Sequence, residues 1–92
     1  MKSYVYIMTN THNTVLYVGV TSDIKTRVAE HKAEVHKYSF TSTYKCNKLV
    51  YLEVFFDINT SIAREKQLKK WKREWKNKLI EEFNPEWQDL LS

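Results

Sequence analysis

Glycine, proline and cysteine each occur only once in this chain of 92 residues. With one glycine and one proline, little of the chain can be flexible linker or tight glycine turn, so most of it is expected to be regular structure. A single cysteine, Cys46, excludes an intramolecular disulfide, and three histidines scattered along the chain do not form a zinc-type cluster. This usage is typical of a reducing compartment and predicts a cytoplasmic protein.

Long hydrophobic runs are missing as well. The N-terminal segment has an apolar run of only five residues, which is short of a signal-peptide core. No segment approaches the roughly 20 apolar residues of a membrane span, so no membrane partner is expected. The length fits a single domain over residues 1–92, and 42% hydrophobic residues with 14% aromatic ones can fill one small core.

Positive charge is concentrated in one stretch of the chain. The net charge is +4, but residues 64–78 contain eight Lys or Arg and two Glu, so they carry +6 and the rest of the chain sums to −2. Trp71 and Trp75 lie within this stretch. Such a surface is typical of binding to a polyanion. A solvated helix face has the same composition, so both interpretations stay open.

Two short runs of β-branched and aromatic residues begin the chain, over residues 4–8 and 15–20. Residues 9–14 between them are rich in turn-forming side chains, so the pattern predicts a β-hairpin.

The register of this hairpin decides which side chains meet. If the turn is centred between Thr11 and His12, Tyr6 lies directly opposite Tyr17, and both side chains project from one face. Gly19 lies on the same side of its strand as Tyr17. There it permits the close approach of backbone or of a substrate phosphate, or else it marks a bulge at the strand end.

Beyond the second run the apolar pattern changes to a helical period, which predicts a helix over about residues 22–36, capped by Thr21 or Ser22. Its apolar positions are Ile24, Val28 and Val35. Arg27 and His31 lie one turn apart on the same side of this helix, flanking the apolar seam.

The next segment, residues 37–47, is polar and predicts a loop. It contains three aromatic residues that serve either as loop anchors or as stacking platforms: Tyr38, Phe40 and Tyr44. Residues 48–56 have apolar side chains on both faces and predict a third, largely covered strand. A helix capped by Asp57 or Asn59 follows, and it is either long or broken near Trp71–Lys72.

Within that helix Glu65 lies roughly 60° from Leu68, at the margin of the buried stripe, which is an unusual place for a lone carboxylate. Pairing with Lys69, four residues on, would also explain it. Asn84 and Pro85 predict a short final helix. Its apolar residues would return to the core: Trp87, Leu90 and Leu91. The elements together predict an α/β fold of the α+β type, with a small, mostly antiparallel three-stranded sheet flanked by helices.

Three segments, read together, closely resemble the GIY-YIG nuclease superfamily, in particular its small stand-alone bacterial members of predicted endonuclease function. They are YVYIMTN, LYVGVTSDIKTRVAEH and SIAREKQLKKW. The resemblance covers nearly the whole chain, and the order and spacing of the motifs make it specific. The chain departs from the family motifs in having Tyr4 in place of the first glycine and Val18 in place of isoleucine.

The resemblance implies a role for each matching residue. Tyr6 ends the first motif, Tyr17 and Gly19 belong to the second, and Arg27 and His31 match the Arg and His of the family's helix. Glu65 is the counterpart of the family's metal-binding glutamate. Asn84 is a candidate for a late asparagine of the family, by its order along the chain only.

The implied activity is that of a metal-dependent DNA endonuclease. Glu65 would hold Mg²⁺ or Mn²⁺, largely coordinated by water and substrate phosphate, and Arg27 would neutralise charge on the phosphate. Tyr6 is favoured as general base, with Tyr17 orienting water or phosphate, although the reverse order is open. A tyrosine base requires a pKa well below its usual value of about 10. His31 would position the phosphate or assist proton transfer.

The basic stretch would then contact the DNA backbone without reading sequence. The expected contacts are Lys69, Lys70, Lys72, Arg73 and Lys76. The alternative function is a non-catalytic module that binds nucleic acid or another partner and has kept the fold. The intact set of matching side chains favours the nuclease, because a degenerate copy would tend to lose some of them.

Overall fold

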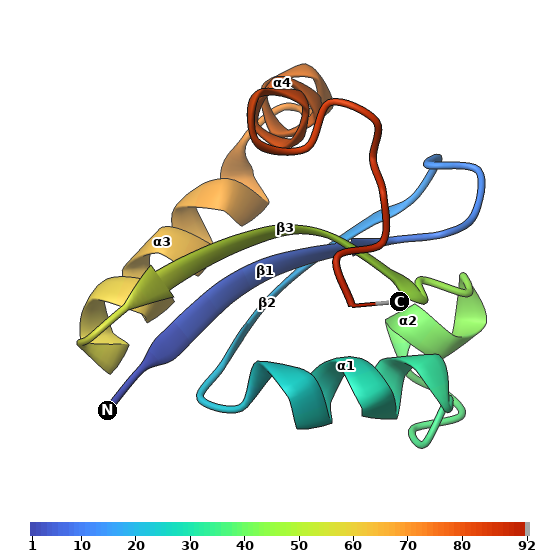
Figure 1. The fold of residues 1–92 in the computed structure, drawn as a ribbon, viewed down its shortest axis with the longest axis horizontal. Coiled ribbons are helices and arrows are strands. Elements are labelled where there is room, and N and C mark those ends of the chain that lie inside the picture. Colours follow the sequence, from blue (N-terminus) through green and yellow to red (C-terminus); the bar gives the residue numbers. More distant parts are fainter. Residues whose placement is uncertain (92) are drawn as a thin grey trace.

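A three-stranded antiparallel sheet forms the centre of the computed structural model, which describes residues 1–91 (Figure 1). β1 (Ser3–Thr9) is the middle strand, with β2 (Leu16–Thr21) on one side and β3 (Lys48–Phe55) on the other, and both neighbours run antiparallel to it. The predicted fold class and the small antiparallel sheet are therefore confirmed.

Helices cover both faces of this sheet (Figure 1). α1 (Ile24–Lys32) and the short α2 (Phe40–Thr43) lie on one side, and α3 (Ile58–Lys70) and α4 (Arg73–Phe83) lie on the other. Within residues 1–91, none of these helices combines the length and the apolar character that crossing a bilayer requires.

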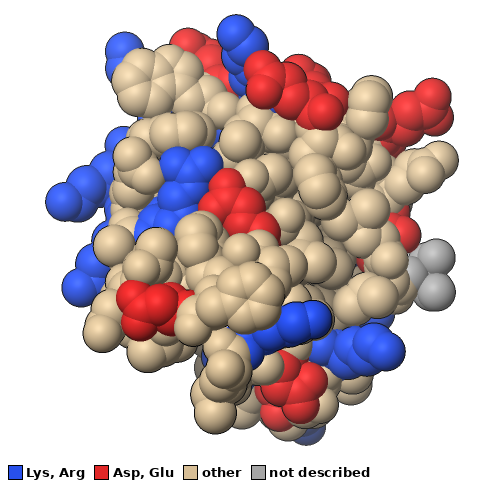
Figure 2. Space-filling view, turned by 60° about the vertical axis from the view of Figure 1, so that its left-hand side comes forward, with Lys and Arg blue, Asp and Glu red and all other residues tan. Residues whose placement is uncertain are grey.

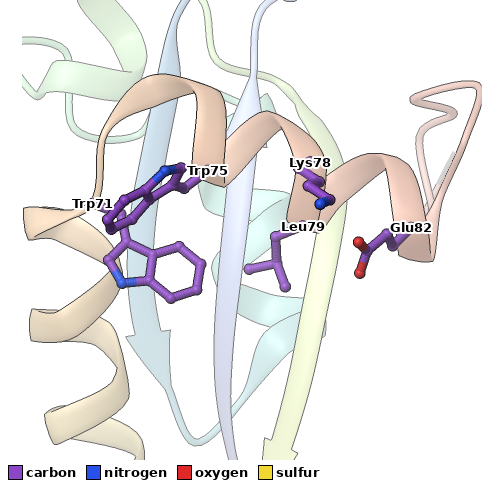
Figure 3. A pocket seen from close by; sticks show the side chains of 5 residues that line it. All are labelled: Trp71, Trp75, Lys78, Leu79 and Glu82. Carbon is purple, nitrogen blue, oxygen red and sulfur yellow. The ribbon is translucent and has the colours of Figure 1, made fainter.

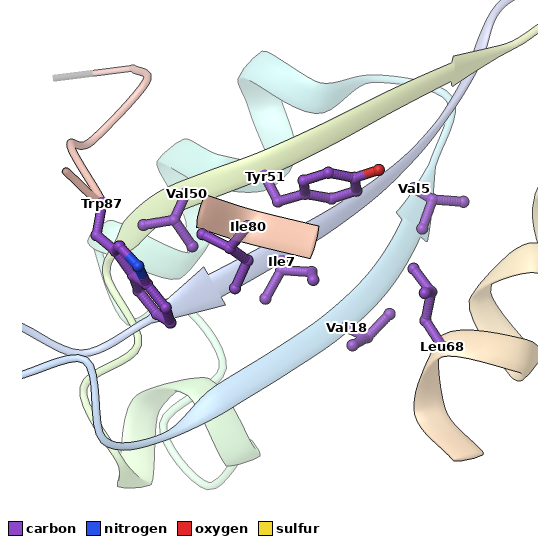
Figure 4. Packing of buried hydrophobic residues seen from close by; sticks show 8 residues of the cluster. All are labelled: Val5, Ile7, Val18, Val50, Tyr51, Leu68, Ile80 and Trp87. Atoms are coloured by element: carbon purple, nitrogen blue, oxygen red, sulfur yellow. The ribbon is translucent and has the colours of Figure 1, made fainter. Parts of the chain in front are cut away.

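The middle strand β1 contributes to two cores. Val5 and Ile7 pack with side chains of α3 and α4, whereas Tyr6 and Met8 point to the opposite face and pack with Val28 of α1. Figure 4 shows the first of these clusters, in which Leu68 of α3 and Ile80 of α4 lie beside side chains of the sheet. Because both faces of β1 are covered, its sequence is apolar at nearly every position instead of alternating.

The hairpin register differs from the prediction by two residues. Tyr6 pairs with Gly19, and Tyr17 pairs with Met8. Since side chains alternate with a period of two, this shift leaves Tyr6 and Tyr17 on the same face, but it places them diagonally instead of directly opposite one another. The irregularity in the sheet lies between Ile7 and Met8, in the pairing of β1 with β3, and not at Gly19.

The ring of Tyr6 occupies the space that a side chain at position 19 would need. A Cβ built on Gly19 would lie 2.5 Å from both Cζ and Oη of Tyr6. The close approach predicted for Gly19 is therefore made by the tyrosine of the neighbouring strand, and neither by backbone nor by substrate. The absence of a side chain at Gly19 sets the position of the Tyr6 ring.

α1 is shorter than the predicted helix over residues 22–36. Its N-cap is Asp23, whose carboxylate accepts a hydrogen bond from the Thr26 amide at 3.2 Å. Thr21, one of the two predicted caps, instead orders the turn before the helix, because its hydroxyl accepts from the Asp23 amide at 3.1 Å. An aspartate carboxylate outcompetes a hydroxyl here because its charge favours the helix N-terminus.

The chain leaves α1 early, since Glu34 has a positive φ of 54° and its carboxylate binds Lys45 at 2.6 Å. Val35 is consequently 58% exposed and not part of the buried seam. The segment predicted as a loop also contains α2, whose N-cap Ser39 accepts from the Ser42 amide at 3.3 Å. Local capping by serine produces this helix without any hydrophobic period in the sequence.

The predicted break between α3 and α4 is present at Trp71 and Lys72, both of which have extended backbone. Asp57 caps α3, one of the two predicted caps. The Arg64 guanidinium lies 5.1 Å from the centre of the Trp71 ring, and this ring packs edge-on against Trp75 at 5.9 Å. These contacts hold the corner without a glycine or a proline.

The final segment does not form the predicted helix. Instead it follows the outer edge of β3, where the Leu90 amide donates to the Leu49 carbonyl at 2.8 Å and the Leu49 amide donates to Asp89 Oδ1 at 3.1 Å. Trp87 is buried as predicted, but Leu90 and Leu91 are 39% and 36% exposed. The hydrogen-bonding capacity of a free strand edge explains why the chain extends here and does not coil.

Substituting Gly19→Ala is expected to destabilise the protein by about 1–3 kcal/mol, because the new methyl group overlaps the Tyr6 ring. In the double variant with Tyr6→Leu, the added cost of the alanine should be much smaller, since the ring is gone. Urea unfolding of the four proteins in this cycle measures the coupling. Additive effects would contradict the assigned contact.

Removing the acceptor for the Leu49 amide should loosen the C-terminal segment. We expect Asp89→Ala to lower the free energy of unfolding by about 1–3 kcal/mol, because it leaves a buried strand amide without a partner. Asp89→Asn is the matched control: it keeps an acceptor oxygen and loses only the charge opposite Lys32, so a cost below about 1 kcal/mol is expected. Equal costs in chemical denaturation would be inconsistent with this role of the side-chain oxygen.

Candidate active site

Three of the predicted site residues meet on the face of the sheet that α1 covers. Tyr6 comes from β1, Tyr17 from β2 and His31 from α1. Their ring centres are 6.2 Å apart between the tyrosines, 5.9 Å from Tyr6 to His31 and 5.5 Å from Tyr17 to His31. Residues distant in sequence therefore form one compact cluster of two phenols and an imidazole.

A chain of hydrogen bonds runs through this cluster. The Tyr6 hydroxyl lies 3.0 Å from His31 Nε2, and His31 Nδ1 lies 2.8 Å from Thr41 Oγ1. Thr41 Oγ1 is in turn 3.2 Å from the Ser39 hydroxyl. Because a neutral imidazole offers one donor and one acceptor, two hydroxyl groups can satisfy both nitrogens and fix the orientation of the ring.

Burial controls the ionisation of the central pair. Tyr6 is fully buried, and this burial raises the pKa of Tyr6 to about 12, although the Arg27 guanidinium beside its hydroxyl opposes the shift. Burial also lowers the pKa of His31, with a further contribution from the Arg27 charge, so the imidazole is neutral at pH 7. The raised tyrosine pKa is opposite to the lowered value that a free tyrosinate base would require.

Arg27 connects the cluster to the surface. Its side chain is 40% exposed, and its guanidinium lies beside the Tyr6 hydroxyl and 3.4 Å from Glu30 Oε1. An exposed pair of this kind holds the guanidinium only weakly. The positive charge is thus available to an anion that approaches the buried tyrosine.

Glu65 is on α3, on the other side of the sheet, and its side chain is only 15% exposed. Its Oε2 binds Lys69 Nζ at 3.1 Å, so the pairing considered as an alternative from the sequence is present.

A groove of about 270 Å³ lies along the outer side of β2 and links the two faces of the sheet. We call it the β2 groove; it is lined by Leu16, Tyr17, Val18, Phe40, Lys69 and Lys76. Tyr17 and the partner of Glu65 therefore border the same hollow, although they come from opposite faces of the sheet.

Glu65, whose partner Lys69 lines this groove, fits a weakly held divalent cation. No group of three or more His, Cys, Asp or Glu side chains able to hold a metal exists within residues 1–91. Glu65 alone offers a carboxylate, which suits Mg²⁺ because this ion keeps most of its water and is commonly bound through one or two carboxylates together with substrate phosphates. Such an ion would replace Lys69 as the partner of Glu65.

The basic residues of the 64–78 stretch have different surroundings. Lys69 and Lys76 line the β2 groove, and Lys70 and Lys72 are exposed. Arg73 is already engaged: its guanidinium donates to the backbone carbonyls of the β1–β2 turn at 2.8 and 2.9 Å and to Asn77 Oδ1 at 3.1 Å. Arg73 thereby ties α4 to the hairpin. On the face seen in Figure 2, several basic side chains lie along the left-hand margin, others lie near the top and the bottom, and acidic side chains are interspersed among them.

Asn84 has a structural role at the C-terminal end of α4. Its amide donates to the carbonyls of Val50 and Gln88 at 3.1 and 2.8 Å, and its Oδ1 accepts from the Gln88 amide at 3.1 Å. All three bonds hold the C-terminal segment against β3. These contacts give no support to a place for Asn84 beside the tyrosines.

A second hollow lies at the corner between α3 and α4, shown in Figure 3. Trp71, Trp75 and Leu79 form its apolar part, and Lys78 and Glu82 line it with opposite charges. It contains none of the residues of the tyrosine cluster.

Sequence reasoning missed Thr41 and Ser39, which extend the hydrogen-bond chain from His31. The Ser- and Thr-rich run around them fits a polar loop as well as a helix cap, and nothing in the sequence places it beside α1. The one usable signal is the serine three residues before Ser42, which is the spacing of an N-cap.

Comparison with known proteins identifies the family and the fold. A family model described as the GIY-YIG catalytic domain matches residues 2–79. A UPF0213 protein of Syntrophus aciditrophicus is 38% identical over 85 residues, which cover 92% of this chain and 95% of that protein. A UPF0213 protein of Staphylococcus haemolyticus is 37% identical over 81 residues, covering 88% and 96% of the two chains.

A solved structure is similar as well. The solution NMR structure of a UPF0213 protein from Bacillus halodurans matches with a TM-score of 0.55 and 26% identity, over 87% of this chain and 83% of that one. The fold and the motif resemblance are thus both confirmed, and the chain belongs to the GIY-YIG family.

Proposed function

We propose that this protein is a metal-dependent DNA endonuclease that hydrolyses phosphodiester bonds at the β2 groove. The observation that carries the proposal is the cluster of Tyr6, Tyr17 and His31, with the Arg27 charge beside it and a groove lined by Tyr17 and by Lys69, the partner of Glu65. Phosphodiester hydrolysis needs a proton acceptor for water and positive charge on the phosphoryl oxygens, and these residues supply both.

In this proposal Tyr17 and Arg27 meet the substrate. Tyr17 lines the groove, so its hydroxyl orients the attacking water or a phosphate oxygen. The half-exposed Arg27 guanidinium binds the phosphate and neutralises charge that develops there. Lys69 and Lys76 hold the neighbouring phosphates of the strand in the groove.

Tyr6 and His31 act together as the base. With a pKa near 12, Tyr6 is not ionised at neutral pH. It can still accept a proton from water on one side while it donates its own to Nε2 of the neutral His31 on the other, so no free tyrosinate is needed. Thr41 accepts the Nδ1 proton of His31 and thereby keeps Nε2 free to receive the proton from Tyr6.

Glu65 would hold the divalent cation, Mg²⁺ or Mn²⁺. When bound, such an ion supplies positive charge to the phosphoryl oxygens. In the protein without a metal ion, Lys69 neutralises the negative charge of the Glu65 carboxylate. This is the charge that would hold the cation.

Replacing Glu65 by glutamine is expected to reduce cleavage of supercoiled plasmid DNA in Mg²⁺ or Mn²⁺ by at least about 100-fold, because the amide carries no charge to hold the ion. Glu74→Gln is the matched control, since Glu74 is an exposed glutamate of the same basic stretch. Agarose-gel nicking assays measure both variants. Equal activity of Glu65→Gln and the control would remove Glu65 from the site.

Tyr6→Phe should lower the cleavage rate by roughly 10²–10⁴-fold, because it removes the hydroxyl that relays the proton. Tyr4→Phe, on the same face of β1, is the control and should leave the rate unchanged.

The pH dependence of cleavage tests His31. Its pKa is lowered from the usual value of about 6.5, so the wild-type rate should begin to fall only below this pH, where the imidazole gains a proton and can no longer accept one. This acidic limb should be missing from the residual activity of His31→Gln. A limb that persists unchanged in the variant would assign the titration to another group.

One observation favours a non-catalytic module that binds nucleic acid. Tyr6 is completely buried, and its pKa is raised, so the most obvious proton acceptor is withdrawn from solvent. Salt-sensitive DNA binding without cleavage in Mg²⁺, Mn²⁺ or any other divalent cation would decide for this function.

A further inference from the structure

We propose that the β2 groove receives an unpaired base of a DNA strand, stacked on Phe40, so that the protein prefers DNA containing a single-stranded segment. The inference rests on the proposed function, because it assigns a substrate class to the same site. The stacking rings, Phe40 and Tyr44, are side chains that the proposed chemistry does not use.

Aromatic rings form one wall of the groove and continue beyond it. Phe40 packs on Tyr17 with ring centres 5.9 Å apart, and Tyr44 packs on Phe40 at 4.7 Å. Phe40 is 45% exposed and Tyr44 is 50% exposed, so the series leads from the buried cluster to solvent. Base faces bind to such rings with little regard to sequence.

These rings are held in place by the site itself. Phe40 is the first residue of α2, between the capping Ser39 and Thr41, which binds His31. A ring anchored in this way loses little freedom when a base stacks on it. Because Phe40 packs on Tyr17, a base stacked on Phe40 would lie beside the tyrosine cluster.

The rest of the charged lining is positive. Lys69 and Lys76 also line the groove, and burial together with the charges of Arg73 and Lys69 lowers the pKa of Lys76. A bound anion would reduce the repulsion between these positive charges. A groove that combines aromatic rings with two ammonium groups matches the two parts of a nucleotide, its base and its phosphate.

The dimensions of the groove favour one base over a duplex. A volume of about 270 Å³ is slightly below the roughly 300–1,000 Å³ of pockets for drug-sized ligands. In a duplex the base faces are stacked inside the helix, and they reach a protein ring only after unstacking. The hollow at Trp71 and Trp75 is a weaker candidate, since the charges of Lys78 and Glu82 in its lining cancel, whereas the charged residues of the β2 groove are both positive.

Fluorescence anisotropy in EDTA tests the inference, because without a divalent cation binding is measured apart from cleavage. The probes are a labelled 12-nucleotide single strand, the matching duplex, and a strand of the same length in which every base is replaced by an abasic site. We expect the single strand to bind most tightly. Phe40→Ala should weaken its binding at least about fivefold and leave the duplex and the abasic strand within twofold.

Three further variants separate stacking from charge, and a measurement of secondary structure separates both from folding. Tyr44→Ala, at a more exposed ring of the same series, should show the same selective loss, and Phe56→Ala, at a 76% exposed ring beyond β3, should show none. Lys76→Gln should weaken all three probes alike. Far-ultraviolet circular dichroism confirms that each variant is folded.

Equal affinity of the wild type for single strand and duplex would overturn the inference. So would an unchanged affinity for the single strand in folded Phe40→Ala and Tyr44→Ala. Selective binding without cleavage in Mg²⁺ or Mn²⁺ would instead refute the nuclease and leave the base-stacking groove standing.

Discussion

The ring of Tyr6 lies directly over Gly19, and the other contacts of the site follow from this packing. With the ring in that position, its hydroxyl reaches His31 on α1, and His31 reaches Thr41 on α2. Any side chain on Gly19 would push the ring away from the sheet. One missing Cβ thus aligns groups from two strands and two helices, which explains why a chain so poor in glycine has its single copy at this position.

Burial of that same ring decides how it can react. Burial disfavours the ionised form of a phenol, and the nearby Arg27 charge offsets only part of this effect. In the proposed mechanism the neutral His31 removes the need for a free tyrosinate, because it takes the phenol's proton as Tyr6 accepts another. The hydrogen bond between Tyr6 and His31 is held by the same packing that stabilises the second core around Met8 and Val28.

Much of this arrangement could be predicted from local patterns in the sequence. Periodicity predicts the strands, the broken helix after β3 and the common face of Tyr6 and Tyr17. The prediction of a common face survives an error of two residues in the register, because side chains alternate between the faces of a strand. The pairing of Tyr6 with Gly19 depends on the turn geometry, which composition does not specify. The role of Thr41 could not be predicted from the sequence for a different reason. It exists only because α2 folds back against α1.

The two faces of the sheet hold different parts of the proposed site. The face under α1 keeps Tyr6 and His31 away from water, whereas Glu65 and Lys69 belong to α3 on the opposite side. The β2 groove is where residues of both faces come together, because Tyr17 of one face and Lys69 of the other line the same hollow. In the proposed function, a DNA strand lying in this groove would contact Tyr17 and Lys69 together. An edge strand, often a liability for aggregation, would then serve to join the two parts of one site.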